Sequence, residues 1–270
     1  MVVQHNLTAM NTNRQLGLTT SAQAKSTEKL SSGYKVNRAG DDAAGLTISE
    51  KMRSQIRGLN KASENAQNGV SLVQTAEGAL NEAHSILQRM NEIATQAAND
   101  TNTTSDRTAI QKEINQLSTE LTRISSTTQF NTMNLLDGKF KNKNLQVGAL
   151  SGQKITISIT SMSATTLGVN ALNVSSFTSA GTAMCAIQKA ISRVSAQRSD
   201  LGAIQNRLEY TINNLNTTSE NTSSAESLIR DTDMATEMVN YSKNQILAQA
   251  GQSMLAQANS ANQGVLSLLQ

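Results

Sequence analysis

A seven-residue repeat of small and apolar side chains runs through the chain from about Leu46 to Asn99. Seven residues span almost two turns of a helix, so the repeat gives one apolar seam that supercoils against partner helices. A helix of some 50 residues would be about 75 Å long. One row of the repeat is Met52, Leu59, Ala66, Val73, Leu80, Leu87 and Ala94, and a second is Ala62, Gly69, Ala76, Ala83, Met90 and Ala97.

The composition favours long helices over a compact globular core. The 270 residues include no proline, the residue that breaks helix interiors, and only 2% are aromatic. Because large aromatic core-fillers are nearly absent, we expect an elongated bundle whose layers are thin. The net charge of +3 is mild, and we interpret the lysines of residues 139–143 as a solvated turn, with no nucleic-acid partner.

Three further segments have a helical period. We expect Thr104 or Ser105 to cap a shorter helix that folds back on the long one. A second heptad segment follows later in the chain and is the natural antiparallel partner of the first. We expect small polar residues from Asn216 to Ser224 to interrupt it, with a final helix from about Leu228. The apolar rows are Ile110, Ile114, Leu117, Leu121 and Ile124 in the shorter helix, and Ile187, Val194, Leu201, Leu208 and Leu215 in the second heptad segment.

The middle of the chain changes to a period of two. Ile155, Ile157 and Ile159 alternate with polar residues, and a Ser-Gly pair at 151–152 precedes them. Alternation of this kind is typical of a strand with one buried face. The sequence therefore predicts a small β-hairpin between helical arms.

The terminal segments, 1–32 and 231–270, have thin apolar stripes among Asn, Gln, Ser and Thr. Two such helices alone would bury little surface. We expect them to be disordered in a monomer and ordered only in an assembly.

The chain lacks the usual signs of catalysis. His5 and His84 are its only histidines, and no metalloprotease, Cys-x-x-Cys or phosphate-loop motif occurs. We expect no enzyme activity, cofactor or metal. Asp41 and Asp42 are interpreted as helix-start residues, and the single Cys185 as a small helix-packing residue. No signal peptide or membrane span is expected.

Several long motifs, in order, resemble those of bacterial flagellins. They cover roughly residues 1–140 and 180–270, and only about forty residues stand where the family often inserts variable outer domains. The motifs are LSSGYKVNRAGDDAAGL at 30–46, QTAEGALN at 74–81, QFNTMNLLDG at 129–138, AQRSDLGA at 196–203, AESLIRDTDMA at 225–235 and ANQGVLSLL at 261–269.

The resemblance implies a mainly α fold: a long antiparallel coiled-coil-like bundle with a small β-hairpin, plus terminal helices that form an inner coiled coil. It implies an inner domain of residues 1–40 and 233–270, and an outer rod of residues 41–232 with its hairpin near 140–175. Such a subunit polymerises into the flagellar filament for motility. It is exported unfolded, without a cleaved signal peptide, and added at the tip outside the cell.

The resemblance also implies partners. They are identical subunits in a helical filament, an export chaperone at the C-terminal end, and the filament cap and hook-junction proteins. The candidates for polymerisation and chaperone contacts are Leu7, Leu18, Leu30, Ile246, Leu255, Val265, Leu266, Leu268 and Leu269.

Many flagellins are recognised by Toll-like receptor 5 through the outer-rod helix, and Arg89 matches the position of a hydrogen-bonding anchor. Leu87 and Ile93 also belong to the apolar rows, so a core role competes with a receptor role for both. The matching positions are Leu87, Gln88, Arg89, Glu92, Ile93, Gln96 and Glu113.

Two other protein classes stay open. A hook–filament junction protein would share the terminal signatures but form rings. A cytoplasmic coiled-coil scaffold would have the heptads without the terminal motifs.

Overall fold

The computed structural model describes residues 6–267, with side chains described for residues 6–261. The chain divides into two compact units. We call residues 1–54 with 221–270 the terminal unit, and residues 55–220 the central unit. Two long helices, α2 (Ala43–Ala97) and α5 (Phe177–Arg230), contribute to both.

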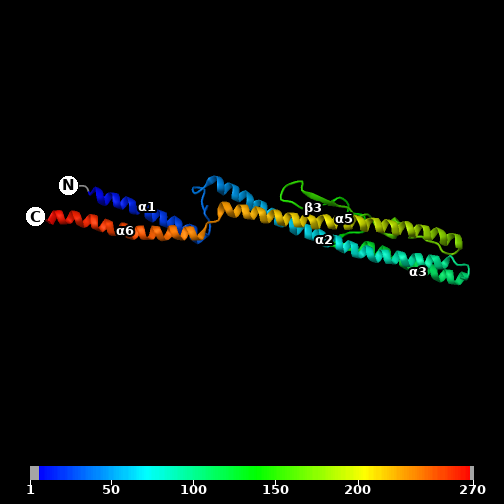
Figure 1. The fold of residues 1–270 in the computed structure, drawn as a ribbon. Helices are drawn as coiled ribbons and strands as arrows, with labels where there is room; N and C mark the ends of the chain where they lie inside the picture. Colours follow the sequence, from blue (N-terminus) through cyan, green and yellow to red (C-terminus); the bar gives the residue numbers. More distant parts are fainter. Residues whose placement is uncertain (1–5, 268–270) are drawn as a thin grey trace. The chain divides into compact units, whose positions relative to one another are not determined.

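In the central unit, α2 and α5 run antiparallel, and α3 (Thr104–Thr127) lies beside α2 (Figure 1). Ser63 Oγ donates to Asn216 Oδ1 at 3.0 Å, and Ser219 Oγ donates to Asn60 Oδ1 at 2.8 Å. The heptad rows face this contact and are almost wholly buried, which confirms the predicted seam. Fully buried members include Ala66, Val73, Leu80, Leu87, Ile187, Val194, Leu201 and Leu208.

Two helix boundaries differ from prediction. The helix α3 is capped by Thr103, whose hydroxyl accepts from the amide of Asp106, while the Asp106 carboxylate accepts from the amide of Thr103. Neither Thr104 nor Ser105 is the cap. This reciprocal pair satisfies two amides that would otherwise lack partners, which fixes the start one residue earlier.

The expected break at 216–224 was wrong, because α5 continues to Arg230 and the next helix begins at Met234. The polar run contains no glycine or proline to end a helix. Its side chains also find partners within the bundle. Asn216 and Ser219 bond to α2, and Thr217 Oγ1 returns to the carbonyl of Asn213.

The predicted hairpin is present as β3 (Lys143–Gln146) and β4 (Lys154–Ile157), which pair antiparallel. Ile155, Ile157 and Ile159 are buried, as the alternation predicted. Gly152 lies at the turn with φ +89°, a conformation that favours glycine. The hairpin rests on α2, where a Cβ added to Gly58 would lie 2.9 Å from the Cβ of Ala149.

Two smaller elements were not predicted. A two-stranded pair joins β1 (Gln129–Phe130) to β2 (Met133–Asn134), and its turn residues Asn131 and Thr132 both have positive φ. A one-turn helix, α4 (Ala164–Leu167), follows β4.

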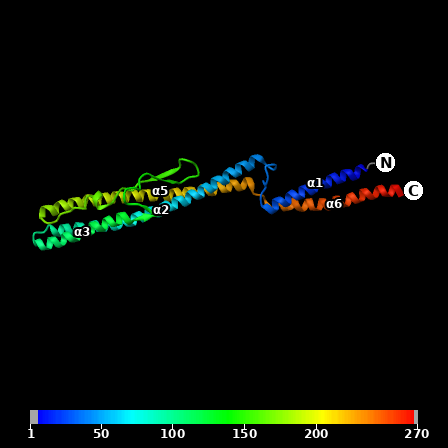
Figure 2. The ribbon, with the colours of Figure 1, turned by 180° about the vertical axis from the view of Figure 1, so that it is seen from behind.

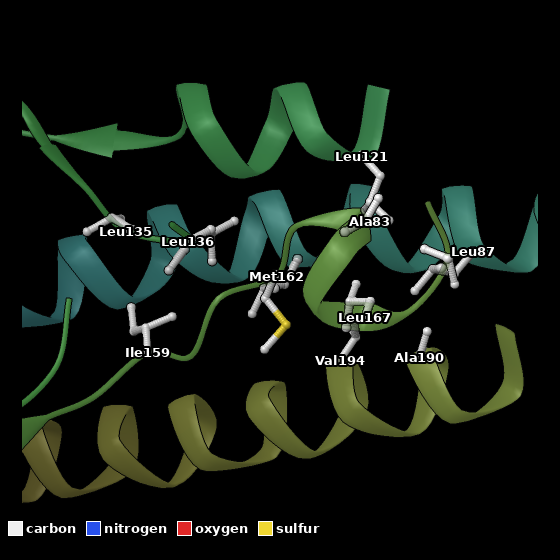
Figure 3. Packing of buried hydrophobic residues seen from close by; sticks show 14 of the residues in the cluster. Ala83, Leu87, Leu121, Leu135, Leu136, Ile159, Met162, Leu167, Ala190 and Val194 are labelled. Carbon is white, nitrogen blue, oxygen red and sulfur yellow. The ribbon is translucent and has the colours of Figure 1, made fainter. Parts of the chain in front are cut away.

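The connecting segments around these elements fill the space between the long helices (Figure 3). Leu135 and Leu136 follow β2, and Met162 precedes α4; all three are buried, together with Leu167 of α4. Leu121 of α3 and Ala83 of α2 also enter this cluster. The core of the central unit is therefore built from helices and irregular chain together.

In the terminal unit, α1 (Leu7–Ser32) pairs antiparallel with α6 (Met234–Ser267), side by side in both views (Figures 1 and 2). Asn6 caps α1, and its Nδ2 also donates to the carbonyl of Ala258. The helix α1 ends at Gly33, which has φ +74°. The chain leaves helix at 33–42 and again at 231–233, close to the predicted domain boundaries. The inner and outer domains stay a prediction.

Candidate assembly and receptor surfaces

Large apolar side chains are exposed along both helices of the terminal unit. Leu7 and Leu18 on α1 are 66% and 63% exposed, and Ile246 on α6 is 66% exposed. Leu30 and Leu255 are half-buried. Of the other assembly candidates, Val265 and Leu266 lie on α6 with side chains outside the description, while Leu268 and Leu269 lie outside the described residues.

The pairing of α1 with α6 covers little of this surface. Ser26 is buried on α1 and Ala248 on α6. Both are small, so the contact is close but buries little apolar area. An open groove of about 680 Å³ runs between the two helices, and it is lined in part by Leu16, Leu247, Gly251 and Met254. The two helices thus present an apolar surface that they do not cover themselves.

The paired aspartates between α1 and α2 have separate structural roles. Asp42 Oδ1 accepts from the amide of Gly45 at 2.8 Å, so Asp42 caps the first turn of α2 as predicted. Asp41 Oδ2 accepts from the amides of Arg38 and Asn37, and the bond from Arg38 is the main reason its pKa lies below the usual value. Among the described residues, no group of three acidic, His or Cys side chains is placed to hold a metal ion.

The receptor candidates lie on α2 and α3, in the central unit. Arg89 donates from Nε and Nη2 to Oε1 of Glu113, at 3.3 and 3.1 Å, and from Nη1 to Glu92 at 3.3 Å. These hydrogen bonds, the one to Glu113 first, raise the pKa of Arg89. Gln88 and Gln96 are exposed on the same helix as Arg89. The structure therefore brings these five polar residues to two neighbouring helices.

Two of the receptor candidates face the core instead. Leu87 is fully buried and Ile93 is 1% exposed. Both belong to the cluster that holds α2 against its neighbours (Figure 3 labels Leu87). Their side chains are not available to a partner without unfolding part of the central unit.

Cys185 was expected to pack between helices, and this was wrong because its side chain is exposed. Its neighbours Ala183 and Ile187 take the buried positions on α5. Position 185 falls between these two on the helix and so turns outward. No helix of the described chain combines the length and apolar character needed to cross a membrane.

Two family models match the chain along most of its length. Residues 3–141 match the model described as "Bacterial flagellin N-terminal helical region", and residues 184–269 match "Bacterial flagellin C-terminal helical region". The chain belongs to the bacterial flagellin family. Flagellins are structural proteins of the flagellar filament and are not enzymes, as expected from the sequence.

Individual flagellins are similar over the whole chain. The flagellin of Halalkalibacterium halodurans is 54% identical over 271 residues, covering 100% of both chains. The "Flagellar filament 31.3 kDa core protein" of Treponema maltophilum is 49% identical over 286 residues, again covering 100% of both. The chain is therefore a short flagellin, without the large variable outer domains that other members of the family insert.

The fold is also found in a hook-associated protein. The solved structure of a "putative flagellar hook-associated protein" from Vibrio parahaemolyticus has a TM-score of 0.60 and 15% identity, and it covers 70% of this chain and 99% of that one. At this identity the likeness shows the fold alone. The sequence, not the fold, assigns the chain to the flagellins.

Proposed function

We propose that this flagellin is a structural subunit that polymerises with identical copies into a bacterial flagellar filament for motility. The observation that supports this most is the uncovered apolar surface of α1 and α6. Full burial of one large apolar side chain contributes about 1.5–3 kcal/mol. Several such side chains per subunit, exemplified by Leu7, Leu18 and Ile246, would supply the main driving force for assembly.

In the proposed arrangement the terminal segments, residues 1–40 and 233–270, form the inner part of the filament. Residues 41–232 form the outer rod. The subunit would be exported unfolded to the outside of the cell and would fold at the filament tip. The absence of proline supports this route, because slow cis–trans isomerisation would not delay refolding. An export chaperone, the filament cap and the hook-junction proteins are the further partners that we propose.

Electron microscopy of protein sheared from cells tests the proposal. A filament subunit gives long uniform filaments. Short caps or rings would favour the hook–filament junction alternative, and soluble monomer would favour a cytoplasmic scaffold.

A truncation tests which part drives assembly. Removal of residues 231–270 deletes α6 but leaves the central unit intact. We expect the truncated protein to keep most of its helical circular dichroism and to form no filaments in a sedimentation assay. Normal polymerisation of the truncated protein would show that the terminal unit does not drive assembly.

A second proposed function is recognition by Toll-like receptor 5. The observation that favours it is the exposed polar group of Gln88, Arg89, Glu92, Gln96 and Glu113 on two adjacent helices. The guanidinium of Arg89 is already held by two carboxylates, so little entropy is lost when it binds. Leu87 and Ile93 are buried in the core and therefore do not belong to this surface.

The receptor proposal is tested with Arg89→Ala, measured as affinity for the receptor ectodomain. We expect at least a tenfold loss, as for an interface anchor. Arg123→Ala is the matched control, because Arg123 is also exposed and paired, with Glu120 at 2.6 Å. Full affinity in Arg89→Ala, or an equal loss in both variants, would count against the anchor.

A further inference from the structure

One segment of the central unit is held in place mainly by side chains of other elements. We call residues 163–174, which include α4, the flap. The amides of Leu167 and Val169 donate to the carbonyls of Ser163 and Ala164, so these backbone hydrogen bonds stay inside the flap. In the part of the chain that the structure describes, no backbone-to-backbone hydrogen bond joins the flap to another helix or strand.

Gln111 of α3 forms two hydrogen bonds to the backbone of the flap. Its Nε2 donates to the carbonyl of Leu172 at 2.7 Å, and its Oε1 accepts from the amide of Val174 at 2.9 Å. The side-chain amide thus pairs with the flap as a peptide group of a neighbouring strand would. Its Nε2 also donates to Asn115 Oδ1 at 3.0 Å, which fixes the orientation of the amide.

Arg193 of α5 forms a hydrogen bond near the other end of the flap. Its Nη1 donates to the carbonyl of Thr166 at 2.8 Å. Arg193 is exposed, so water competes for this bond, whereas Gln111 is half-buried. Of the two side chains, Gln111 therefore contributes more to holding the flap.

One face of the flap is buried against the long helices. Its buried apolar residues are Ala164, Leu167, Val169 and Val174, and all four belong to the core of the central unit. Figure 3 shows Leu167 between α2 and α5. The closed flap therefore covers apolar side chains of the helices.

The rest of the flap borders open grooves. A groove of about 400 Å³ lies beside Gln111, between the start of α3 and residues 171–175. A second groove, of about 380 Å³, lies beside Arg193, between α5 and residues 160–167. Water thus reaches the flap from both sides, and neither of the two bonded side chains is enclosed in the core.

Fixed points bound the flap at both ends. The amide of Met162, directly before it, donates to the carbonyl of Leu136 at 3.0 Å. After it, Ser176 Oγ accepts from the amide of Ser179 at 3.2 Å, at the start of α5. Motion of the flap can therefore be confined to the residues between these points.

We infer that the flap opens and closes as one unit while the long helices stay folded, with Gln111 as the positioning residue that holds it closed. Opening breaks the bonds to Gln111 and Arg193 and exposes four apolar side chains, but it breaks no pairing of helices or strands. Segments with few such contacts open at a lower cost than the whole unit. The open form uncovers apolar surface that is hidden in the closed one.

This inference concerns the central unit of the free chain and depends on neither filament formation nor receptor binding. Amide hydrogen exchange of the full-length chain tests it, with each rate divided by its intrinsic rate. The reporters are the amides of Leu167 and Val169, because their acceptors lie inside the flap and neither amide bonds to Gln111. The reference amides are those of Ile114 and Leu121 in the interior of α3, which report unfolding of the helices.

In the unsubstituted chain we expect the two flap amides to exchange at a common rate, at least tenfold faster than the reference amides. Gln111→Ala should speed both flap amides roughly tenfold, since two hydrogen bonds are lost. Gln111→Met keeps a side chain of similar length without the amide and should give the same increase. Gln205→Ala is the matched control, because Gln205 bonds within α5 to Glu209, and it should leave the flap rates within about twofold.

A substitution away from the flap separates its opening from unfolding of the whole unit. Val73 on α2 is fully buried, about 15 Å along the helix from Ala83, which lies in the cluster around the flap. Val73→Ala should speed the reference amides at least fivefold and leave the flap amides within about twofold, because opening of the flap keeps the contacts of Val73. Circular dichroism of each variant confirms that the helices are folded.

Three outcomes would overturn the inference. In the first, flap and reference amides exchange at equal rates and respond equally to every substitution, so the flap opens only when the helices unfold. In the second, Gln111→Ala leaves the rates of Leu167 and Val169 unchanged. In the third, Gln111→Met exchanges like the unsubstituted chain, which would mean that packing and not the amide of Gln111 holds the flap.

Discussion

The terminal and central units are both built from long helices, yet the central unit buries its large apolar side chains and the terminal unit leaves most of its own exposed. Among the described side chains, the buried apolar residues of the terminal unit are Val36 and Ala248, whereas more than thirty lie in the central unit. Eleven of the fifteen exposed large apolar residues are in the terminal unit; the other four are Met133, Leu150, Phe177 and Tyr210.

The difference follows from the number of layers in each unit. A helix in a pair buries one stripe and leaves the opposite stripe uncovered. The central unit adds a third helix, the hairpin and the connecting segments of Leu135, Leu136 and Met162, which close its core (Figure 3). In the terminal unit α1 and α6 form a two-helix pair, so further burial of the apolar side chains on these two helices requires another molecule. Incomplete packing is thus a property of architecture as much as of sequence.

The same substitution in both units gives the sharpest contrast. Leu80 on α2 is fully buried, while Leu18 on α1 is 63% exposed. Leu80→Ala should lower the free energy of unfolding of the free chain by about 2–5 kcal/mol, because it removes core contacts and leaves a cavity. Leu18→Ala should change it by less than about 0.5 kcal/mol. Urea denaturation followed by circular dichroism measures both.

The effects of the two substitutions on assembly should have the reverse order of their effects on stability. At a temperature where both chains are folded, we expect Leu18→Ala to reduce the sedimentable polymer more than Leu80→Ala does. If Leu18→Ala destabilised the free chain as strongly as Leu80→Ala, the surface of α1 would already be covered in the monomer, and the comparison would fail.

Two glycines of α2 test whether the hairpin completes the central core. Gly58 faces Ala149 of the hairpin turn, whereas nothing lies within 4 Å of a Cβ added to Gly78. Gly58→Ala should destabilise the chain by about 1–3 kcal/mol, since the backbone of residue 149 must move. Gly78→Ala should stabilise it by about 0.5–1 kcal/mol through helix propensity. Thermal unfolding that gave the same sign for both would contradict the hairpin's packing role.

The heptad period alone predicted the long helices and their buried rows. This worked because each position of the repeat returns to the same face of one helix. The alternation at Ile155, Ile157 and Ile159 predicted the hairpin for the same local reason. Leu135, Leu136 and Met162 have no such period, so their burial depends on a space created by helices distant in sequence.

The candidate surfaces were predictable only in part. The thin apolar stripes of the termini indicated residues such as Leu18 and Ile246, which the structure leaves exposed. The proximity of Arg89 to Glu113 depends on where the chain turns between α2 and α3, and no pattern in the sequence states that distance. The antiparallel bridge between Tyr34 and Asp231 was not predicted, because a pairing between residues so distant in the sequence has no local signature.

The smallest expected difference concerns a threonine–aspartate pair that stands at the start of one helix in each unit. Thr103 holds the carboxylate of Asp106 at the start of α3, and Thr236 holds that of Asp233 at the start of α6. In each case the threonine hydroxyl is the first cause of a pKa below the usual aspartate value. A lowered pKa stabilises the folded state above the usual value near 4, and this stability is lost as the pH falls through the lowered pKa.

The two helices should respond differently once Asp106 and Asp233 are protonated. The core holds α3 through Ile110, Ile114 and Leu121, while α6 has Ala248 as its buried apolar residue. The amides of Ala235 and Thr236 donate to the carboxylate of Asp233, and the amide of Thr103 donates to that of Asp106. Between pH 6 and pH 3 we therefore expect amide exchange at residues 235–236 to lose more protection than at residue 103, after correction for intrinsic rates. Asp233→Asn keeps a capping acceptor without the charge, so it should remove the pH dependence at α6 alone. Equal loss of protection at the starts of both helices would mean that the packing around a helix does not decide the stability of its first turn.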